Sequence, residues 1–286
     1  MRVSGLDHRT VRKRPALLRA LGNDDPPNQV TVRGATYRRS EILKHDSWAA
    51  TAIYHNERHE RIICKFGRTE SVCGIPLAWF GRALAVREAR FLRQLADVET
   101  IPEDLGDVSS EGRLLPNAIA RRYIDGEPMR VKQKVDPHIF DELHGLLQTM
   151  HKRNMAYVDL HKLENVVVGQ NGRPYLIDFQ FCFALSERWP GNGRLARYCL
   201  ARLQEIDIYH FNKHLTRCLP ETLTAEQIRE KSQMPRVIRL HRLFAVPLRT
   251  ARRKLLVLIR VRDSAGSASS ELEPEDAYRP EGARRQ

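Results

Sequence analysis

The sequence predicts an α+β protein in two halves: a small antiparallel sheet with one helix, then a larger and mostly helical part. Between residues 30 and 66, three strand-like segments, YRRSEIL, WAATAIYHN and RIICKF, are separated by polar turns. From residue 136 onward, apolar residues recur instead at the three- and four-residue spacing of helices. The change of pattern predicts two regions of different architecture.

One helix is expected within the first half. An apolar stripe at helical spacing runs through residues 76–97. The stripe consists of Leu77, Phe80, Leu84, Phe91 and Leu95. The segments IPEDLGDV and LPNAIARRYI then predict two further strands, and DGEP (125–128) predicts a break after them.

The second half opens on a helix and continues into a hairpin. Asp136 is a plausible N-cap, followed by Pro137 at the first helical turn. Farther on, VVV and YLI flank the turn GQNG (169–172), where Asn-Gly tolerates a positive φ. More helices are expected through about residue 231.

The hairpin brings oxygen-bearing side chains together. If its turn centres near residues 170–171, Asn165 lies roughly opposite Leu176, and Asn165 and Asp178 emerge at the same open end. Asp159 lies in the loop that enters this end. Two carboxylates and a carboxamide are the hard oxygen ligands that Mg²⁺ prefers, so the sequence predicts a magnesium site here.

The net charge of +13 is concentrated at the ends of the chain. Residues 1–22 contain six Lys/Arg and one Asp, and residues 232–262 contain nine Lys/Arg and no acid. Residues 263–286 are rich in small and charged residues and are expected to be disordered. The nearly neutral centre argues against a nucleic-acid-binding core.

Five parts follow from these patterns. They are a basic N-terminal arm (1–29), the first half (30–124), the second half (125–231), a basic amphipathic segment (232–262) and the tail (263–286).

Two interpretations of the segment 232–262 stay open. It is either an amphipathic anchor on an anionic membrane or a helix packed on the second half with a solvated basic face. Nucleic acid is disfavoured as its partner because few aromatic residues interleave the charges.

The chain is expected in the cytoplasm, with a peripheral position at the inner membrane if the basic segment binds lipid. No run of 18 apolar residues occurs, and the first residues lack an apolar secretory core. Five cysteines without a C-x-x-C pair support neither a disulfide framework nor a cysteine-rich zinc site.

The string YVDLHKLENVVV followed by LIDFQ resembles the catalytic loop and metal-binding segment of protein-kinase-like enzymes. The resemblance implies a bilobal protein-kinase-like fold, with residues 30–124 as the N-lobe and 125–231 as the C-lobe. It implies that Asp159 is the catalytic base and that Asn165 and Asp178 are metal ligands. His161 is then expected to face the transferred phosphate.

The resemblance also implies an ATP site. Lys65 in IICKF resembles the strand lysine that pairs with the α- and β-phosphates. Glu88 lies on the apolar stripe of the predicted helix, where a carboxylate is costly unless it is paired, so we expect it to pair with Lys65. The segment DGEP resembles the hinge between the lobes. The backbone of Tyr123, Ile124 and Asp125 is expected to contact adenine.

Four departures separate the chain from regulated protein kinases. Asn165 follows Asp159 by six residues instead of five, DFQ replaces DFG, Val158 replaces an arginine, and no A-P-E motif occurs. These features resemble an atypical bacterial branch that includes RIO-like, lipopolysaccharide-core sugar and aminoglycoside-type kinases.

The phosphate-covering loop is also unusual, because no G-x-G-x-x-G precedes Lys65. The segment HDSWAATAIY stands in its place, with Ser47, Ala49 and Ala50 as small substitutes. Small side chains still let backbone N–H groups approach phosphates, though less closely than glycine does.

The main functional hypothesis is an ATP- and magnesium-dependent kinase acting on a hydroxyl, with a lean toward protein serine or threonine. A lipopolysaccharide-core sugar (Kdo or heptose) at the inner membrane is the alternative acceptor. A pseudokinase scaffold is the alternative from another class, and a nucleic-acid-associated RIO-type kinase is a weaker one.

Overall fold

The computed structural model describes residues 15–72, 74–130, 135–186, 191–235, 238–239 and 254. The strands of the first region are β1 (Gln29–Val32), β2 (Ala35–His45), β3 (Ala49–His55), β4 (Arg61–Gly67), β5 (Asp104–Gly106), β6 (Val108–Ser110), β7 (Arg113–Leu114) and β8 (Ala118–Arg122). Those of the second region are β9 (Gly126–Pro128), β10 (Met155–Ala156), β11 (Val166–Gly169), β12 (Pro174–Leu176) and β13 (Phe183–Ala184). The α-helices within these residues are α1 (Ala78–Gln94), α2 (Pro137–Lys152), α3 (Arg194–Cys218) and α4 (Ala225–Lys231), with 3₁₀ turns at Ala16–Leu18, Leu163–Asn165 and Pro220–Thr222.

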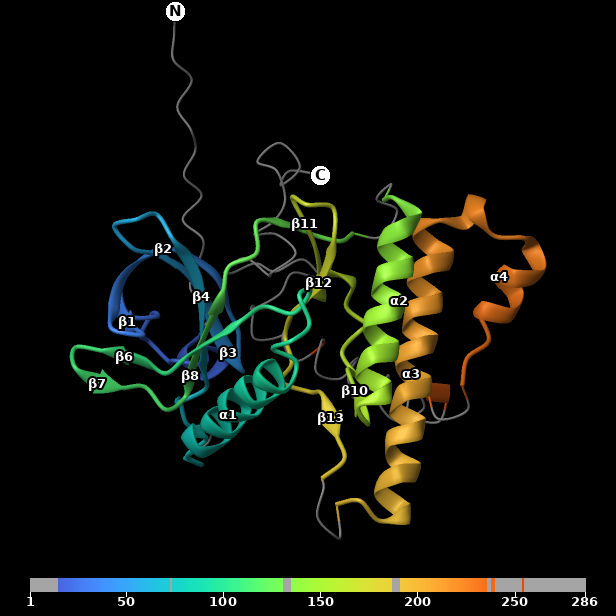
Figure 1. Cartoon of the computed structure of the whole chain (residues 1–286). Helices are drawn as coiled ribbons and strands as arrows, with labels where there is room; N and C mark the ends of the chain where they lie inside the picture. Colours follow the sequence, from blue (N-terminus) through green and yellow to red (C-terminus); the bar gives the residue numbers. More distant parts are fainter. Residues whose placement is uncertain are drawn as a thin grey trace, which may run out of the picture.

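An eight-stranded antiparallel sheet forms the first region, in the order β5-β8-β4-β3-β2-β1-β6-β7. The sheet curls, and α1 lies beside β4 and β8 (Figure 1). One face encloses a core of Val, Ala, Ile, Tyr and Phe side chains, including Tyr54 and Phe66. Leu43, Ile53 and Ile63 form a smaller apolar cluster on the other face, with Tyr123 packed against it.

Helices dominate the second region, where α2 and α3 lie side by side (Figure 1). The Asp136 side chain accepts a hydrogen bond from the backbone N–H of His138, and Pro137 occupies the first turn, as predicted. The largest buried cluster among the described residues joins α1 and α2 to the loops around β10–β12, through residues such as Phe91, Leu147 and Phe179.

The mixed composition of α-helices and a large antiparallel sheet is confirmed, and two details differ from the prediction. The sheet is larger than predicted because residues 29–32 and 104–114 add short strands at its edges. The hairpin is displaced by one residue: Val166, not Asn165, lies opposite Leu176. Its turn closes through the bond from Gly169 N to Arg173 O, and Gly172 has a φ of 76°.

Residues 15–29, at the end of the predicted basic N-terminal arm, include the 3₁₀ turn Ala16–Leu18 and the first residue of β1. Arg19 is 2% exposed and bonds the Gly22 carbonyl, Asp25 and His45. Arg68 is 1% exposed. Its guanidinium donates to carbonyl oxygens of Leu17 (2.9 Å), Ser47 (2.7 Å) and Glu70 (2.7 Å). Buried guanidinium groups require such acceptors, and the polar sequence around residue 25 gave no sign of them.

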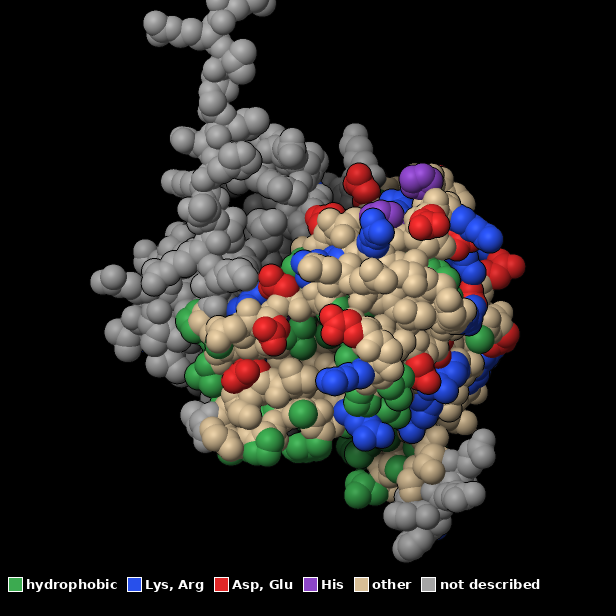
Figure 2. Space-filling view, turned by 90° about the vertical axis from the view of Figure 1, so that its left-hand side faces the viewer, with side chains coloured by type: hydrophobic (Ala, Val, Ile, Leu, Met, Phe, Trp, Pro, Cys, Tyr) green, Lys and Arg blue, Asp and Glu red, His purple; other side chains and the backbone are tan. Residues whose placement is uncertain are grey.

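The exposed face of the sheet region carries mixed charge. Lys/Arg and Asp/Glu side chains are interspersed there, and hydrophobic side chains gather along its lower edge (Figure 2). No helix among the described residues is long and apolar enough to cross a membrane. Most of the segment 232–262 and all of the tail 263–286 lie outside the described residues.

Replacing Arg68 by Met is expected to lower the free energy of unfolding by about 3 kcal/mol, since buried carbonyl groups lose a charged donor. Urea denaturation measures the change. Arg38→Met removes the same charge from an exposed position on β2 and should change stability by less than about 0.5 kcal/mol. Equal effects of the two substitutions would contradict a structural role for Arg68.

Candidate functional site

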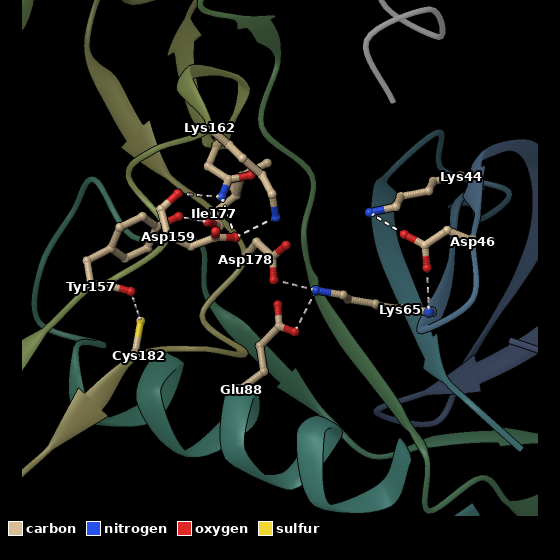
Figure 3. Close-up of polar contacts among 12 residues, drawn as sticks. Lys44, Asp46, Lys65, Glu88, Tyr157, Asp159, Lys162, Ile177, Asp178 and Cys182 are labelled. Carbon is tan, nitrogen blue, oxygen red and sulfur yellow. Dashed lines mark hydrogen bonds and ion pairs between the residues drawn. The ribbon is translucent and has the colours of Figure 1, made fainter. Parts of the chain in front are cut away.

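A lysine held by two carboxylates joins the two regions. Lys65 Nζ lies 2.9 Å from Glu88 Oε2 and 2.7 Å from Asp178 Oδ1 (Figure 3). Lys65 comes from β4, Glu88 from α1, and Asp178 from the loop after β12. The structure therefore brings together three residues that the sequence placed in one site, although 113 positions separate Lys65 from Asp178.

Burial makes this cluster electrostatically strong. Glu88 is 1% exposed, and its Oε1 has no hydrogen-bond partner within the described chain. Burial raises the pKa of Glu88 although Lys65 opposes the rise. Burial would also raise the pKa of Asp178, but the charge of Lys65 outweighs it and holds this pKa far below the ordinary value. Asp178 is thus a carboxylate at neutral pH.

Two glycines allow α1 to approach β4 closely. A Cβ at Gly67 would lie 2.4 Å from the Gly81 carbonyl oxygen, and a Cβ at Gly81 would lie 2.1 Å from the Arg68 carbonyl oxygen. Any larger side chain would push the helix away from the strand. This contact sets the depth at which Glu88 meets Lys65.

Asp159 is surrounded by donors. Asn165 Nδ2 donates to Asp159 Oδ2 (3.1 Å), Lys162 Nζ lies 2.8 Å from the same oxygen, and His161 Nδ1 lies 3.0 Å from Oδ1. Burial would raise the pKa of Asp159, but the hydrogen bond from His161 and the charge of Lys162 together lower it. The carboxylate is therefore ionised and held in one orientation.

The longer loop between Asp159 and Asn165 is absorbed by a 3₁₀ turn at Leu163–Asn165. Asn165 Nδ2 also donates to the Asp159 backbone oxygen (3.2 Å), which closes the loop. Because the amide nitrogen makes these bonds, the Oδ1 atom of Asn165 is available as an acceptor or ligand. The sequence reasoning did not single out Lys162, which the loop places beside the Asp159 carboxylate.

Two residues beside this site, Val158 and Asp178, have a strained backbone. Val158 (φ 69°) and Asp178 (φ 65°) both adopt the left-handed region, which is unfavourable for non-glycine residues and most of all for a β-branched one. Asp207 holds the first of them: its carboxylate accepts from the backbone N–H of Val158 (2.7 Å) and of Tyr157 (2.8 Å).

Asp207 on α3 was missed by the sequence reasoning. It is completely buried, and His151 Nε2 lies 3.0 Å from its Oδ2. The sequence contains the same kind of signal for Asp207 as for Glu88, namely an acidic residue at helical spacing among apolar residues. Asp207 lies at helical spacing among the buried residues Leu200, Phe211 and His214, and an acid on a buried face requires partners.

Two histidines of α3 lie close to the loop that carries Asp159. His214 Nε2 is 2.8 Å from the Leu160 carbonyl oxygen, next to Asp159. The ring of His210 lies 5.9 Å from that of His161. Burial lowers the pKa of both His210 and His214 to about 4, aided for His210 by the neighbouring His161. Both rings are therefore neutral at pH 7.

Tyr123 and Ile124 follow β8, and the DGEP segment predicted as a break and hinge begins at Asp125 and continues as β9 (Gly126–Pro128). The backbone N–H of Tyr123 donates to the Arg61 carbonyl (3.4 Å), and the Arg61 guanidinium lies over the Tyr123 ring and bonds Asp125. The Asp125 carbonyl accepts from Gln170 N. The Ile124 backbone makes no hydrogen bond within the described chain, so its polar groups are available to a ligand.

The turn at residues 46–49, which stands where a glycine-rich loop would be, is held by hydrogen bonds within the protein. Asp46 Oδ1 accepts from the backbone N–H groups of Trp48 (2.7 Å) and Ala49 (2.9 Å). Ser47 Oγ donates to the Leu18 carbonyl, and the Ala50 side chain packs in the main core of the sheet. The backbone N–H groups of Trp48 and Ala49 therefore already have an acceptor inside the chain.

The donor set fits magnesium better than a metal that needs a closed protein cage. Among the described residues, no group of three or more His, Cys, Asp or Glu side chains is arranged to hold a metal ion. Magnesium commonly takes only one or two carboxylates from a protein, with the remaining ligands from phosphates and water. Asp178 and the Asn165 Oδ1 atom meet that requirement.

No family model matches this sequence, and no curated protein matches it. Among solved structures, the Rio2 kinase–ADP/Mg²⁺–phosphoaspartate complex from Chaetomium thermophilum resembles the chain with a TM-score of 0.47 and 16% identity, over 68% of this chain and 60% of that one. A second structure of the Rio2 kinase from Chaetomium thermophilum gives a TM-score of 0.43 and 16% identity, over 65% and 59%. The chain thus matches about three-fifths of the length of each. At these TM-scores the similarity identifies no function for the chain.

The neutral histidines make stability depend on pH. Their folded-state pKa values lie near 4, below the ordinary 6.5, so the unfolded chain binds more protons between these values. Stability should therefore fall as pH decreases from 7 to 5, by about 1 kcal/mol for each histidine after allowing for partial exposure. Urea denaturation at both pH values measures the difference. His214→Gln keeps an N–H donor for Leu160 and should reduce the pH dependence by about half; an unchanged slope would exclude His214 as its source.

Proposed function

We propose that this protein is an ATP- and magnesium-dependent phosphotransferase acting on a hydroxyl group. The observation that carries the proposal is the Lys65 contact with Glu88 and Asp178 next to Asp159. Phosphoryl transfer needs phosphates held by a cation, a metal-binding carboxylate and a group that orients the acceptor. This cluster contains a residue of each kind.

Lys65 would hold nucleotide phosphates, with Glu88 fixing its position. Asp178 and Asn165 would bind Mg²⁺, which neutralises charge developing on the phosphates. Lys65 and Asp178 already carry opposite charges that are complementary to phosphate and metal. Each therefore exchanges one ionic partner for another when the nucleotide binds, and no new charge is buried without a partner.

Asp159 would orient the acceptor hydroxyl and accept its proton. Its two oxygens are positioned by Asn165, His161 and Lys162, so the carboxylate needs little reorganisation. Lys162 would also offset negative charge on the transferred group. The proposed role of His161 at that group is supported by its position 3.0 Å from Asp159.

The nucleotide base would pack beside the hinge. Leu43, Ile53, Ile63 and Tyr123 form an apolar cluster there, and the unused backbone groups of Ile124 would bind the edge of the base. Apolar surface with a few convergent polar groups is the usual composition of a small-molecule site.

The acceptor is proposed to be a protein serine or threonine, with a lipopolysaccharide-core sugar as the alternative. The E-N pair and the D-F pair favour the first, and the basic segment 232–262 favours the second and a peripheral membrane position. A pseudokinase scaffold is disfavoured because Lys65, Asp159 and Asp178 are all retained and lie together around the site.

The proposal predicts magnesium-dependent binding of ATP. ATP with Mg²⁺ should raise the melting temperature of the full chain, and omission of Mg²⁺ should remove most of the rise, because Asp178 then repels the phosphates. Asp178→Ala should lose the magnesium dependence, whereas the exposed Asp136→Ser, which keeps an N-cap acceptor, should behave as wild type. No stabilisation of the wild type by ATP under either condition would contradict the proposal.

Asp159→Asn should bind ATP as the wild type does but transfer phosphate at least about 10²-fold more slowly, since it removes the base and keeps the size of the side chain. Labelled ATP offered with separate protein and lipopolysaccharide fractions measures transfer and identifies the acceptor class. Labelling of neither fraction by a wild type that binds Mg²⁺-ATP would favour the scaffold.

A further inference from the structure

A β-bulge in β2 directs a second lysine toward the candidate site. Ile42 pairs with Ala52 and Lys44 pairs with Thr51, so Leu43 is an extra residue between the two pairs. In a regular ladder Leu43 would lie opposite Thr51 and Lys44 would point to the other face of the sheet. Bulges commonly redirect a side chain in this way beside functional sites.

Lys44 and Lys65 project from the same face of the sheet. Lys44 pairs with Thr51 on β3, and Thr51 pairs with Lys65 on β4. Directly paired residues share a face, and two strand spacings separate their backbones by about 10 Å. Figure 3 shows the ammonium group of Lys44 pointing from β2 toward Asp178 and Lys162. Burial would raise the pKa of Asp178, but the charge of Lys65 lowers it, and the charge of Lys44 lowers it further.

Asp46 connects Lys44 to the turn above the site. Its Oδ2 lies 2.7 Å from Lys44 Nζ, and its Oδ1 accepts from the N–H groups of Trp48 and Ala49. The carboxylate thus occupies the backbone donors that a glycine-rich loop would offer to phosphate. The lysine remains 29% exposed and can reach a ligand by rotating its flexible side chain.

We propose that Lys44 is a phosphate-binding residue of the nucleotide site, supplying the positive charge that the turn's backbone N–H groups do not supply. This inference rests on the proposed function and adds a residue and a mode of phosphate binding to it. Together, Lys44 from β2 and Lys65 from β4 would contact the nucleotide phosphates from the same sheet face, with Asp46 holding Lys44 when no phosphate is bound.

Calorimetric titration of the full chain with Mg²⁺-ATP and with adenosine tests the inference. Lys44→Met should weaken ATP binding by at least about tenfold, because a charge-assisted contact is lost, and should leave adenosine binding unchanged. Arg38→Met removes the same charge from the exposed far part of β2 and should leave both affinities unchanged. Lys44→Gln provides a second, polar substitution if the Met variant is unstable.

The substitution Asp46→Asn distinguishes the contribution of Lys44 from that of the turn. The Asn oxygen can still accept from Trp48 and Ala49, while Lys44 loses a competing anion, so ATP should bind at least as tightly as to the wild type. Weakening as large as that of Lys44→Met would overturn the inference, as would equal ATP affinity of Lys44→Met and wild type. A wild type that binds adenosine but not ATP, or neither, would instead overturn the proposed function itself.

Discussion

The Lys65 ammonium is the point through which the two regions of the protein are joined at the site. It opposes the rise in the pKa of Glu88 that burial causes, and it keeps Asp178 ionised on the opposite side. Removing one partner from such a cluster leaves an uncompensated buried charge. The positions of β4, α1 and the loop after β12 are therefore coupled, and the Asp178 carboxylate is held in place by Lys65.

The loop that carries Asp159 is positioned from below by α3. Asp207 accepts the backbone N–H groups of Tyr157 and Val158, and His214 bonds the Leu160 carbonyl. These contacts offset the cost of the strained Val158 backbone. The helix thus fixes the two residues on either side of Asp159, while Asn165, His161 and Lys162 fix its side chain.

The sequence was most informative where an energetic conflict was visible in it. Glu88 lies on an apolar helix stripe, where a carboxylate requires a partner, and that partner is Lys65. Asp207 is also an acid on a buried helix face and could have been identified in the same way. The hairpin register was wrong by one residue because Asn-Gly indicates a turn but not its length. Arg68 is buried partly through its bond to the Leu17 carbonyl, 51 positions away, and the bulge at Leu43 depends on the register of β2 against β3. The apolar and turn patterns of the sequence indicate neither contact.

The segment before Lys65 lacks the glycines of a glycine-rich phosphate-binding loop. We explain this by a different distribution of positive charge around the proposed phosphate site, not by loss of activity. In a glycine-rich loop, backbone N–H dipoles surround the phosphates. Here Asp46 binds those dipoles, which would leave the site deficient in positive potential if nothing else had changed. The same carboxylate, however, holds Lys44 on the sheet face that also carries Lys65. The full charge of Lys44 would then act where the partial charges of backbone N–H groups act in a glycine-rich loop, and this lysine is still 29% exposed. A phosphate bound between Lys44 and Lys65, as proposed, would account for the bulge that directs Lys44 toward this face of the sheet.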